Sequence, residues 1–349
     1  MRAVYFLGDR KIDIRSIPDP TPGPGEVVIE IKASGMCGTD LKYYRAKDGA
    51  SAIGFFSSSS APVIAGHEPC GIVCAVGSGV TSPLARIDRR VMNHHYAGCG
   101  CCNSCQTGWT QMCDEGSIVF GANANGAHAK YMKVPAASLV ALPDDLSFQT
   151  GAAISCGTGT AWGGLQRLGL RGNDTIAIFG QGPVGLSGTQ LSTAMGARVI
   201  AIDFDDARLQ RAAELGAHIT INARAEDAAA VILEATHGRG VECSMDCTGA
   251  SAARSAAIRS MGKWGRVVFV GEGGDVTIDV STEMNRKQLS IYGSWTFSKS
   301  GQADCARFVA ERKIDIDSLF THSWPLEEAE AAYTLFDTQT TGKGFLIPD

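Results

Sequence analysis

Four regularly spaced cysteines limit how the first third of this chain can fold. They follow one another as Cys-x2-Cys-x2-Cys-x7-Cys, at Cys99, Cys102, Cys105 and Cys113. Four thiolates on one short segment can occupy the corners of a tetrahedron, which is the geometry of closed structural zinc sites. The spacing therefore predicts a zinc-binding lobe over about residues 94–116, with Cys101 as a spectator outside the pattern.

Two other interpretations of this lobe are less well supported. The start of the sequence has too short an apolar run for a signal peptide, so we expect a cytoplasmic protein, in which disulfides are disfavoured. A zinc ribbon that binds nucleic acid needs clustered positive charge, but the formal net charge is -5 and only Lys130 and Lys133 lie near the lobe. No stretch approaches the length of a membrane span. We expect neither nucleic acid nor a membrane as a partner.

A second group of metal-ligand residues is dispersed along the chain. Cys37 lies in Gly-Met-Cys-Gly-Thr-Asp, His67 in Gly-His-Glu, and Cys156 in Ser-Cys-Gly-Thr-Gly-Thr. Each of these residue types, taken singly, is more often part of a protein core. Together, two thiolates and one imidazole form a three-ligand zinc site whose fourth position is open to water or substrate, as catalysis requires.

The length and the hydrophobic pattern predict two domains. A chain of 349 residues with 44% hydrophobic content can bury an ample core. Its first third has strand-like segments between Pro and Gly turns, at residues 27–32, 71–76 and 129–134. From about residue 172, short apolar runs alternate with helical stretches, which predicts a parallel α/β sheet with strands at 175–180, 199–203, 241–246 and 266–271.

A glycine-rich string in the second half predicts a dinucleotide site. Gly180-Gln181-Gly182-Pro183-Val184-Gly185 follows an apolar strand and precedes a helical stretch, and the next strand ends in Asp203. The glycines let the backbone approach a pyrophosphate at a helix N-terminus, while Asp203 can bind the adenosine ribose hydroxyls. Because that carboxylate would repel a 2′-phosphate, NAD is favoured over NADP. Arg208 is close enough to stack on adenine or, less readily, to meet a phosphate.

These motifs resemble those of the zinc-dependent medium-chain alcohol and polyol dehydrogenases, a family of the medium-chain dehydrogenase/reductase superfamily. The resemblance covers essentially the whole chain, in the family's order. It implies a GroES-like, β-rich catalytic domain at residues 1–157 and 297–349, with a doubly wound Rossmann domain inserted at residues 158–296. It also implies two zinc ions per subunit, one catalytic and one structural, and a homodimer or homotetramer.

The resemblance also implies roles for the residues near the catalytic zinc. Cys37, His67 and Cys156 would ligate this ion, with Glu68 beside it as a transient ligand. Asp40 would orient His67, as metal-bound imidazoles usually require. Thr39 would take the proton of the alcohol, and Lys42 stands where many relatives have the histidine at the outer end of the proton relay.

Cofactor contacts follow from the same resemblance. Thr160 would touch the nicotinamide face, Val270 would be a further cofactor-binding residue, and Lys343 would meet the pyrophosphate. The other cofactor-binding residues are those already named: Gly180, Gly182, Pro183, Val184, Gly185, Asp203 and Arg208.

The expected activity is hydride transfer between a primary or secondary alcohol and NAD, giving an aldehyde or ketone. By this resemblance Cys156 favours simple alcohols, whereas residues 37–41 resemble the polyol and threonine dehydrogenases as much as the alcohol dehydrogenases. Aromatic candidates for the substrate pocket suit an apolar alcohol better than a sugar; together with His94 they are Tyr43, Tyr44, Phe55, Phe56, Trp295 and Phe297. Phe55 and Phe56 precede a serine run at 57–60 that is interpreted as a surface loop or as a pocket cover.

Two other functional classes are open at this point. A zinc-free reductase of conjugated double bonds shares the two-domain plan but has no use for an open three-ligand site. A non-catalytic nucleotide-binding protein keeps the fold without the chemistry. The intact ligand set and Asp203 argue against the reductase, and the intact ligand set and Thr39 argue against the non-catalytic protein.

Overall fold

The computed structural model describes residues 1–47, 62–340 and 342–348, so the sequence-predicted loop at 55–60 lies outside the described residues. The chain forms two compact units. The first combines Met1–Cys156 with Ser298–Asp349, and the second is Gly157–Phe297.

The first unit is built on a mixed sheet whose described strands run in the order β16-β17-β3-β4-β5-β9, with β8 also paired to β3. The central strands β3 and β4 are antiparallel and bury most of their side chains. Their apolar side chains pack with those of β5, β8 and β9 into one core. These strands have the bounds β3 Glu26–Gly35, β4 Glu68–Val76, β5 Arg90–Asn93, β8 Tyr131–Pro135, β9 Leu139–Ala141, β16 Phe320–Pro325 and β17 Lys343–Ile347.

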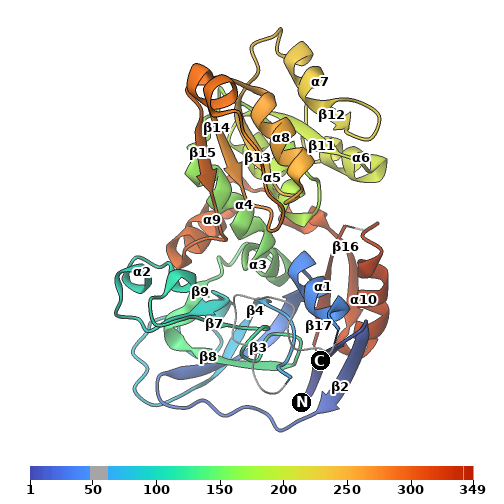
Figure 1. The fold of residues 1–349 in the computed structure, drawn as a ribbon. Coiled ribbons are helices and arrows are strands. Elements are labelled where there is room, and N and C mark those ends of the chain that lie inside the picture. Colours follow the sequence, from blue (N-terminus) through green and yellow to red (C-terminus); the bar gives the residue numbers. More distant parts are fainter. Residues whose placement is uncertain (48–61, 341, 349) are drawn as a thin grey trace. The chain divides into compact units, whose positions relative to one another are not determined.

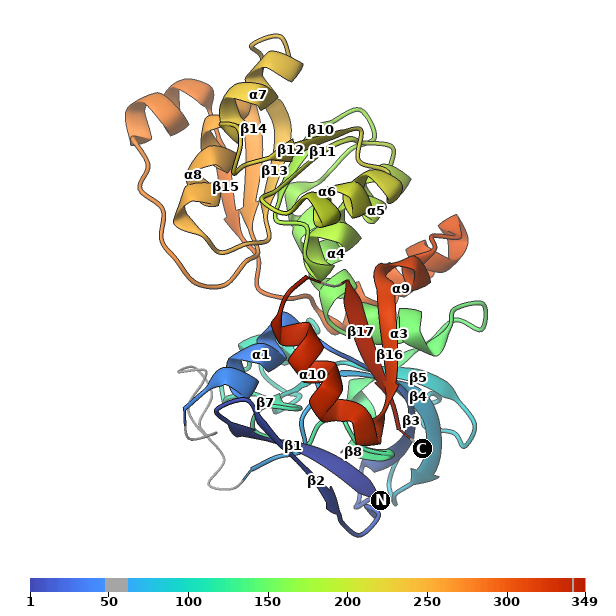
Figure 2. The same cartoon turned by 90° about the vertical axis from the view of Figure 1, so that its right-hand side faces the viewer.

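Segments from the two ends of the sequence lie side by side in this unit. β17 pairs antiparallel with β3, with Phe345 opposite Gly35 (Figure 1). Helix α10 (Ala329–Asp337) packs beside α1 (Gly38–Arg45) and the hairpin of β1 and β2 (Figure 2), and their apolar side chains share a buried cluster. The remaining elements of the unit are β1 Arg2–Gly8, β2 Lys11–Ser16, β6 Tyr96–Ala97, β7 Ile118–Val119, α2 Asn103–Gln106, α3 Phe148–Ile154 and α9 Lys299–Arg312.

The second unit is a doubly wound parallel sheet with the order β12-β11-β10-β13-β14-β15. Its central strand Thr175–Phe179 is buried on both faces, as expected where helices cover both sides of a parallel sheet. In Figure 2, α5 and α6 lie on one face and α7 and α8 on the other. The bounds are α4 Gly157–Leu168, β10 Thr175–Phe179, α5 Pro183–Ala194, β11 Arg198–Asp203, α6 Asp206–Glu214, β12 Ile219–Asn222, α7 Ala228–Ala235, β13 Val241–Asp246, α8 Ser251–Arg259, β14 Met261–Phe269 and β15 Ser290–Gly293.

The sequence places the predicted strands correctly but misjudges where several of them begin. β3 and β4 extend further than predicted because they pair with one another over most of their length. β14 begins at Met261, five residues before the predicted 266, because Met261 pairs with Val241 ahead of a register shift. Within that irregular stretch Trp264 has a positive φ of 64°, a conformation that a sequence pattern does not signal.

None of the helices in the described residues is long and apolar enough to span a membrane.

Candidate metal centres and cofactor site

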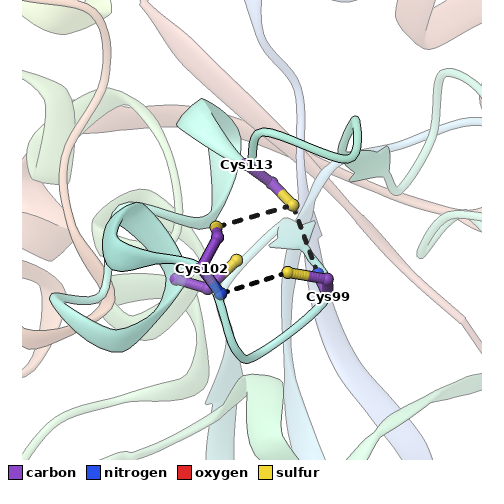
Figure 3. A group of neighbouring side chains, drawn as sticks. Cys99, Cys102 and Cys113 are labelled. Carbon is purple, nitrogen blue, oxygen red and sulfur yellow. Dashed lines mark hydrogen bonds between the residues drawn. The ribbon is translucent and has the colours of Figure 1, made fainter.

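The predicted structural lobe brings its four cysteine sulfurs together. The Sγ atoms of Cys99, Cys102, Cys105 and Cys113 all lie within 4.8 Å of one another. Figure 3 labels three of these side chains, and a dashed line marks the contact between the sulfurs of Cys102 and Cys113. These two sulfurs are 4.0 Å apart. Sulfurs at the corners of a zinc tetrahedron are about 3.8 Å apart when each zinc–sulfur bond is about 2.3 Å. The lobe therefore fits one zinc ion with little movement.

Backbone N–H groups of the lobe donate hydrogen bonds to two of its cysteine sulfurs. The N–H groups of Cys102 and Cys99 donate to the sulfurs of Cys99 and Cys113, respectively. Amides of Cys101 and Cys102 lower the pKa of Cys99 to about 6, whereas burial raises the pKa of Cys105 to about 12. Metal binding requires both thiols to lose their protons. Cys101 is exposed, with its sulfur 3.5 Å from that of Cys99, and lies outside the four-sulfur group.

Removing one lobe ligand should destabilise the protein through loss of this metal. We expect Cys105→Ser to bind one zinc ion fewer per chain and to lower Tm by about 10 °C, since a closed zinc site contributes directly to folding free energy. Metal analysis and calorimetry measure the two effects. Cys101→Ser is the matched control and should change neither value. A Cys105→Ser protein with unchanged melting would refute the structural assignment.

The second predicted ligand group also converges. Cys37 caps the N-terminus of α1, His67 directly precedes β4, Glu68 begins that strand, and Cys156 lies between α3 and α4. One ligand atom from each of these four residues lies within 4.8 Å of the others. The sulfurs of Cys37 and Cys156 are 3.9 Å apart, again close to the edge of a zinc tetrahedron of about 3.8 Å. The donor set of two sulfurs, one imidazole and one carboxylate suits zinc.

Asp40, in the first turn of α1, joins two of these ligands. Its Oδ1 lies 2.9 Å from Nδ1 of His67, and its Oδ2 accepts the backbone N–H of Cys37 at 2.8 Å. Burial opposes ionisation of Asp40, but the neighbouring His67 lowers the pKa of Asp40 below its ordinary value. The hydrogen bond to Nδ1 leaves Nε2 of His67 as the metal-binding nitrogen. The expected role of Asp40 in orienting His67 therefore has a geometric basis.

Glu68 forms a buried ion pair with Lys343. The two side chains are 0% and 2% exposed, and Nζ of Lys343 also donates to the carbonyl of Met36 at 3.1 Å. Burial raises the pKa of Glu68 to about 7, although the Lys343 ammonium opposes this shift. Oε1 of Glu68 is buried and has no hydrogen-bond partner among the described residues, so it is available to a metal ion.

The position of Lys343 corrects one sequence prediction. Lys343 was expected to meet a pyrophosphate, but its ammonium is enclosed in the first unit against Glu68 and Met36. The physical reason is the pairing of β17 with β3 and of β16 with β17, which turns the side chain of Lys343 inward.

The other residues of the predicted catalytic unit differ in how far they are buried. Thr39 is the second residue of α1 and half-buried, while Lys42 is on the exposed face of the same helix. Tyr44 is 3% exposed and packs its ring edge against Phe6, so it belongs to the core of the first unit. Phe297 at 1% and His94 at 0% exposure are core residues as well. The two phenylalanines at 55 and 56 lie outside the described residues.

The glycine-rich string forms the tight turn between β10 and α5. Gly180 has φ +88°, and a Cβ on Gly185 would lie 1.7 Å from the carbonyl oxygen of Gly180, so neither position accepts a side chain. Gly182 is the N-cap of α5 and Pro183 its first residue, with no side chain capping the helix. The amides of Val184 and Gly185 are thus available to an anion, whereas that of Leu186 donates to the carbonyl of Gly182 at 2.9 Å.

Asp203 ends β11 next to this turn. Its Oδ2 accepts the N–H of Gln181 at 2.6 Å, and its Oδ1 accepts the N–H of Phe204 at 2.8 Å. Arg208 Nη1 is 3.8 Å from the same carboxylate. Asp203 therefore ties the glycine turn to the end of the next strand and carries the negative charge that the NAD prediction requires.

Two other residues expected to contact the cofactor, Thr160 and Val270, lie within the second unit. Thr160 is on α4 and 9% exposed. Val270 directly follows β14, and its N–H donates to the carbonyl of Asp246 at 2.9 Å. The side chain of Val270 lies beside Gly164 of α4, because a Cβ on that glycine would be 3.0 Å from Cγ2 of the valine.

Sequence reasoning missed two residues that the structure connects to the metal centre. The hydroxyl of Tyr333 lies 3.2 Å from Oδ2 of Asp40 and 2.6 Å from Nε2 of His128. All three side chains are fully buried. No motif signals this contact, because Tyr333 is 293 residues from Asp40 and has the spacing of an ordinary core aromatic on an amphipathic helix.

Comparison with protein-family models matches both units. Residues 23–144 match the alcohol dehydrogenase GroES-like domain, and residues 183–311 match the zinc-binding dehydrogenase model. Among curated proteins, the chain is 37% identical over 347 residues to the uncharacterized zinc-type alcohol dehydrogenase-like protein YphC of Escherichia coli, covering 98% of this chain and 97% of that protein. It is 31% identical over 337 residues to sorbitol dehydrogenase of Bacillus subtilis, covering 95% and 92%. L-threonine 3-dehydrogenase of the same species is also 31% identical, over 341 residues, covering 96% and 94%.

Solved structures confirm the predicted fold class. Alcohol dehydrogenase TADH from Thermus sp. ATN1 superposes with a TM-score of 0.90 at 28% identity, covering 100% of both chains. An alcohol dehydrogenase from Escherichia coli CFT073 in complex with NADH has a TM-score of 0.87 at 26% identity, covering 99% of both. A zinc-binding dehydrogenase from Sinorhizobium meliloti bound to NADP has a TM-score of 0.87 at 27% identity, also covering 99% of both.

Proposed function

Because the chain belongs to the zinc-dependent medium-chain dehydrogenase family, we propose that it oxidises a primary or secondary alcohol to an aldehyde or ketone with NAD. The observation that carries this proposal is the convergence of Cys37, His67 and Cys156 with Glu68 beside them. A family member that has lost catalysis does not need an open three-ligand site with the buried carboxylate of Glu68 beside it.

Each residue of this group has a defined task in the proposed reaction. Cys37, His67 and Cys156 would hold a zinc ion, which as a Lewis acid lowers the proton affinity of a bound alcohol. Asp40 keeps the imidazole of His67 in the tautomer that offers Nε2. Lys343 compensates the charge of Glu68, so that this carboxylate stays available next to the ligands without an unpaired buried charge.

Thr39 is the proposed first acceptor of the alcohol proton. It follows Cys37 by two residues on the first turn of α1, which places its hydroxyl group on the segment that also supplies a metal ligand. A hydroxyl can accept one proton while it donates its own, so it can pass the proton on without becoming charged.

NAD is the proposed cofactor because of Asp203. Its carboxylate lies at the end of β11 beside the glycine turn, where it would bind ribose hydroxyls and repel a 2′-phosphate. The solved relatives bind either form of nicotinamide cofactor, so the preference of this chain rests on that charge.

We expect Asp203→Ala to raise the KM for NAD roughly 10-fold or more and to narrow the preference for NAD over NADP, since charged hydrogen bonds to the ribose are lost. Steady-state kinetics with both cofactors and one alcohol measure the change. Asp203→Asn keeps the shape of the side chain and one acceptor oxygen for the N–H of Gln181. It therefore separates the effect of the lost charge from the effect of the lost hydrogen bond to Gln181. Equal use of both cofactors by the unmutated protein would contradict the assignment.

A second substrate class is supported by the relatives. Two of them are named as sorbitol and L-threonine 3-dehydrogenases, and two of the aromatic residues expected to favour an apolar alcohol, Tyr44 and Phe297, lie in the core instead. A polyol or a hydroxy amino acid is therefore the alternative substrate.

One experiment distinguishes these possibilities. NADH formation is followed with zinc-replete protein, NAD and a panel of aliphatic, aromatic, polyol and hydroxy amino acid substrates. Turnover on any of them supports the dehydrogenase proposal, and the best substrate identifies the class. If no substrate of the panel is turned over with either NAD or NADP, the non-catalytic alternative is favoured.

A further inference from the structure

A continuous chain of buried hydrogen bonds extends from the metal centre into the core of the first unit. It begins at His67 and continues through Asp40 to Tyr333, then to His128, and ends at Ser34. The four contacts measure 2.9, 3.2, 2.6 and 2.7 Å, in that order. Four of the five side chains are 0% exposed, and His67 is 6% exposed. Water therefore does not compete for these bonds.

The contacts and protonation of the members fix the direction of every bond. Oδ2 of Asp40 accepts the backbone N–H of Cys37, so it is an acceptor oxygen and the hydroxyl of Tyr333 donates to it. Burial raises the pKa of Tyr333 well above its ordinary value, which keeps the phenol protonated with a single hydrogen to donate. The hydroxyl oxygen must then accept from Nε2–H of His128.

The remaining end of the chain follows by the same reasoning. Burial lowers the pKa of His128 to about 4, so this imidazole is neutral and carries one N–H. With that hydrogen on Nε2, the other nitrogen is an acceptor, and the hydroxyl of Ser34 donates to Nδ1. Every polar hydrogen in the chain has one acceptor, and each bond specifies the next.

His128 also contacts the backbone beside His67 directly. Gly66 has φ +87°, and a Cβ built on it would lie 2.4 Å from Nδ1 of His128, so the imidazole packs against the bare backbone of the residue before His67. The imidazole of His128 thus supports the position of His67 in two ways. One is packing through Gly66, and the other is hydrogen bonding through Tyr333 and Asp40.

We propose that Tyr333 and His128 are positioning residues of the catalytic metal centre, which hold Asp40 in the orientation that presents Nε2 of His67 to the metal. Without the phenol hydroxyl, Oδ2 of Asp40 keeps only the N–H of Cys37 and the carboxylate gains freedom to turn. The imidazole of His67 then loses its fixed angle. This inference rests on the proposed zinc site but concerns residues that lie outside the ligand set.

The test is Tyr333→Phe in the full-length protein loaded with cadmium in place of zinc. Cadmium NMR gives separate resonances for a four-sulfur site and for a site with two sulfurs and one nitrogen. We expect the resonance of the mixed site to shift or broaden, and its metal affinity by chelator competition to fall roughly 10- to 100-fold, the effect typical of such supporting residues. The resonance of the four-cysteine lobe should stay unchanged and serves as an internal control.

Matched variants separate positioning from a loss of packing. Tyr44→Phe removes a hydroxyl from a ring that is adjacent to Tyr333, with centroids 5.7 Å apart, but that takes no part in the chain of bonds; it should leave both resonances unchanged. Ser34→Ala deletes only the hydroxyl at the far end of the chain of bonds. It should change the mixed-site resonance and its metal affinity in the same direction as Tyr333→Phe, but less. This milder variant provides the measurement if Tyr333→Phe does not fold.

The outcomes are distinct. A wild-type mixed-site resonance that is unaffected by Tyr333→Phe and Ser34→Ala overturns the positioning role while the proposed function stands. A wild-type protein without any mixed-site resonance overturns both. Equal changes in Tyr44→Phe and Tyr333→Phe show packing alone and also overturn the positioning role.

Discussion

Cys37→Ser should reduce the rate of alcohol-dependent NADH formation roughly 1,000-fold or more. The substitution removes one of the two thiolates that converge with His67, and a zinc ion contributes several kcal/mol of charge stabilisation to such a reaction. Serine keeps the backbone N–H that donates to Asp40, so the first turn of α1 retains its cap. The loss should therefore reflect the metal rather than a misfolded segment.

The metal content and a second cysteine test this explanation. Cys37→Ser should retain the lobe zinc and lose the other ion, which metal analysis resolves. Cys74 is a half-buried cysteine of β4, and its sulfur contacts the carbonyl of Val28, so Cys74→Ser is the matched control and should keep its activity. Wild-type turnover in Cys37→Ser would exclude the zinc-dependent mechanism.

Lys343→Met should lower the free energy of unfolding by about 3–5 kcal/mol, because it leaves the carboxylate of Glu68 buried without its partner. Methionine preserves most of the volume of the side chain, which limits the cavity contribution. The carbonyl of Met36 also loses the hydrogen bond that Nζ donates. Urea denaturation followed by circular dichroism measures the change in stability.

A double variant determines whether the charge is the cause. Glu68→Gln removes the charge but keeps the shape, so Lys343→Met combined with Glu68→Gln should recover most of the lost stability. Arg2→Met is the control, since the ion pair of Arg2 with Glu327 is exposed and should be worth less than about 1 kcal/mol. If the double variant is no more stable than Lys343→Met alone, the cost comes from packing.

The sequence predicted the local parts of the sites better than the distant ones. The four lobe cysteines lie within 15 residues, so their spacing alone implied that their sulfurs could meet. Asp203 is the last residue of the apolar strand that follows the glycine turn, so the α/β pattern predicted its place at the carboxyl end of the parallel strands. In both cases the information is contained in short-range spacing and in the period of the elements.

The role of Lys343 could not be predicted in this way. The family resemblance implied a contact with a pyrophosphate, whereas the structure places Lys343 at the start of β17, with Glu68 as its partner. That partner is set by which strand lies beside β3, and strand order is a property of the whole unit. Tyr333 and His128 were missed for the same reason, because only the tertiary fold brings them to Asp40.

The order in which the ribosome makes this chain has a consequence for when the metal centre matures. Tyr333 emerges 293 residues after Asp40, which at about 5–20 residues per second is a delay of roughly 15–60 s. During that interval the nascent chain has neither Lys343 to pair with Glu68 nor β17 to cover the edge of β3. The second unit, Gly157–Phe297, is fully synthesised before either arrives. Completion of the proposed metal centre is thus a late event of biogenesis, which follows translation of the second unit.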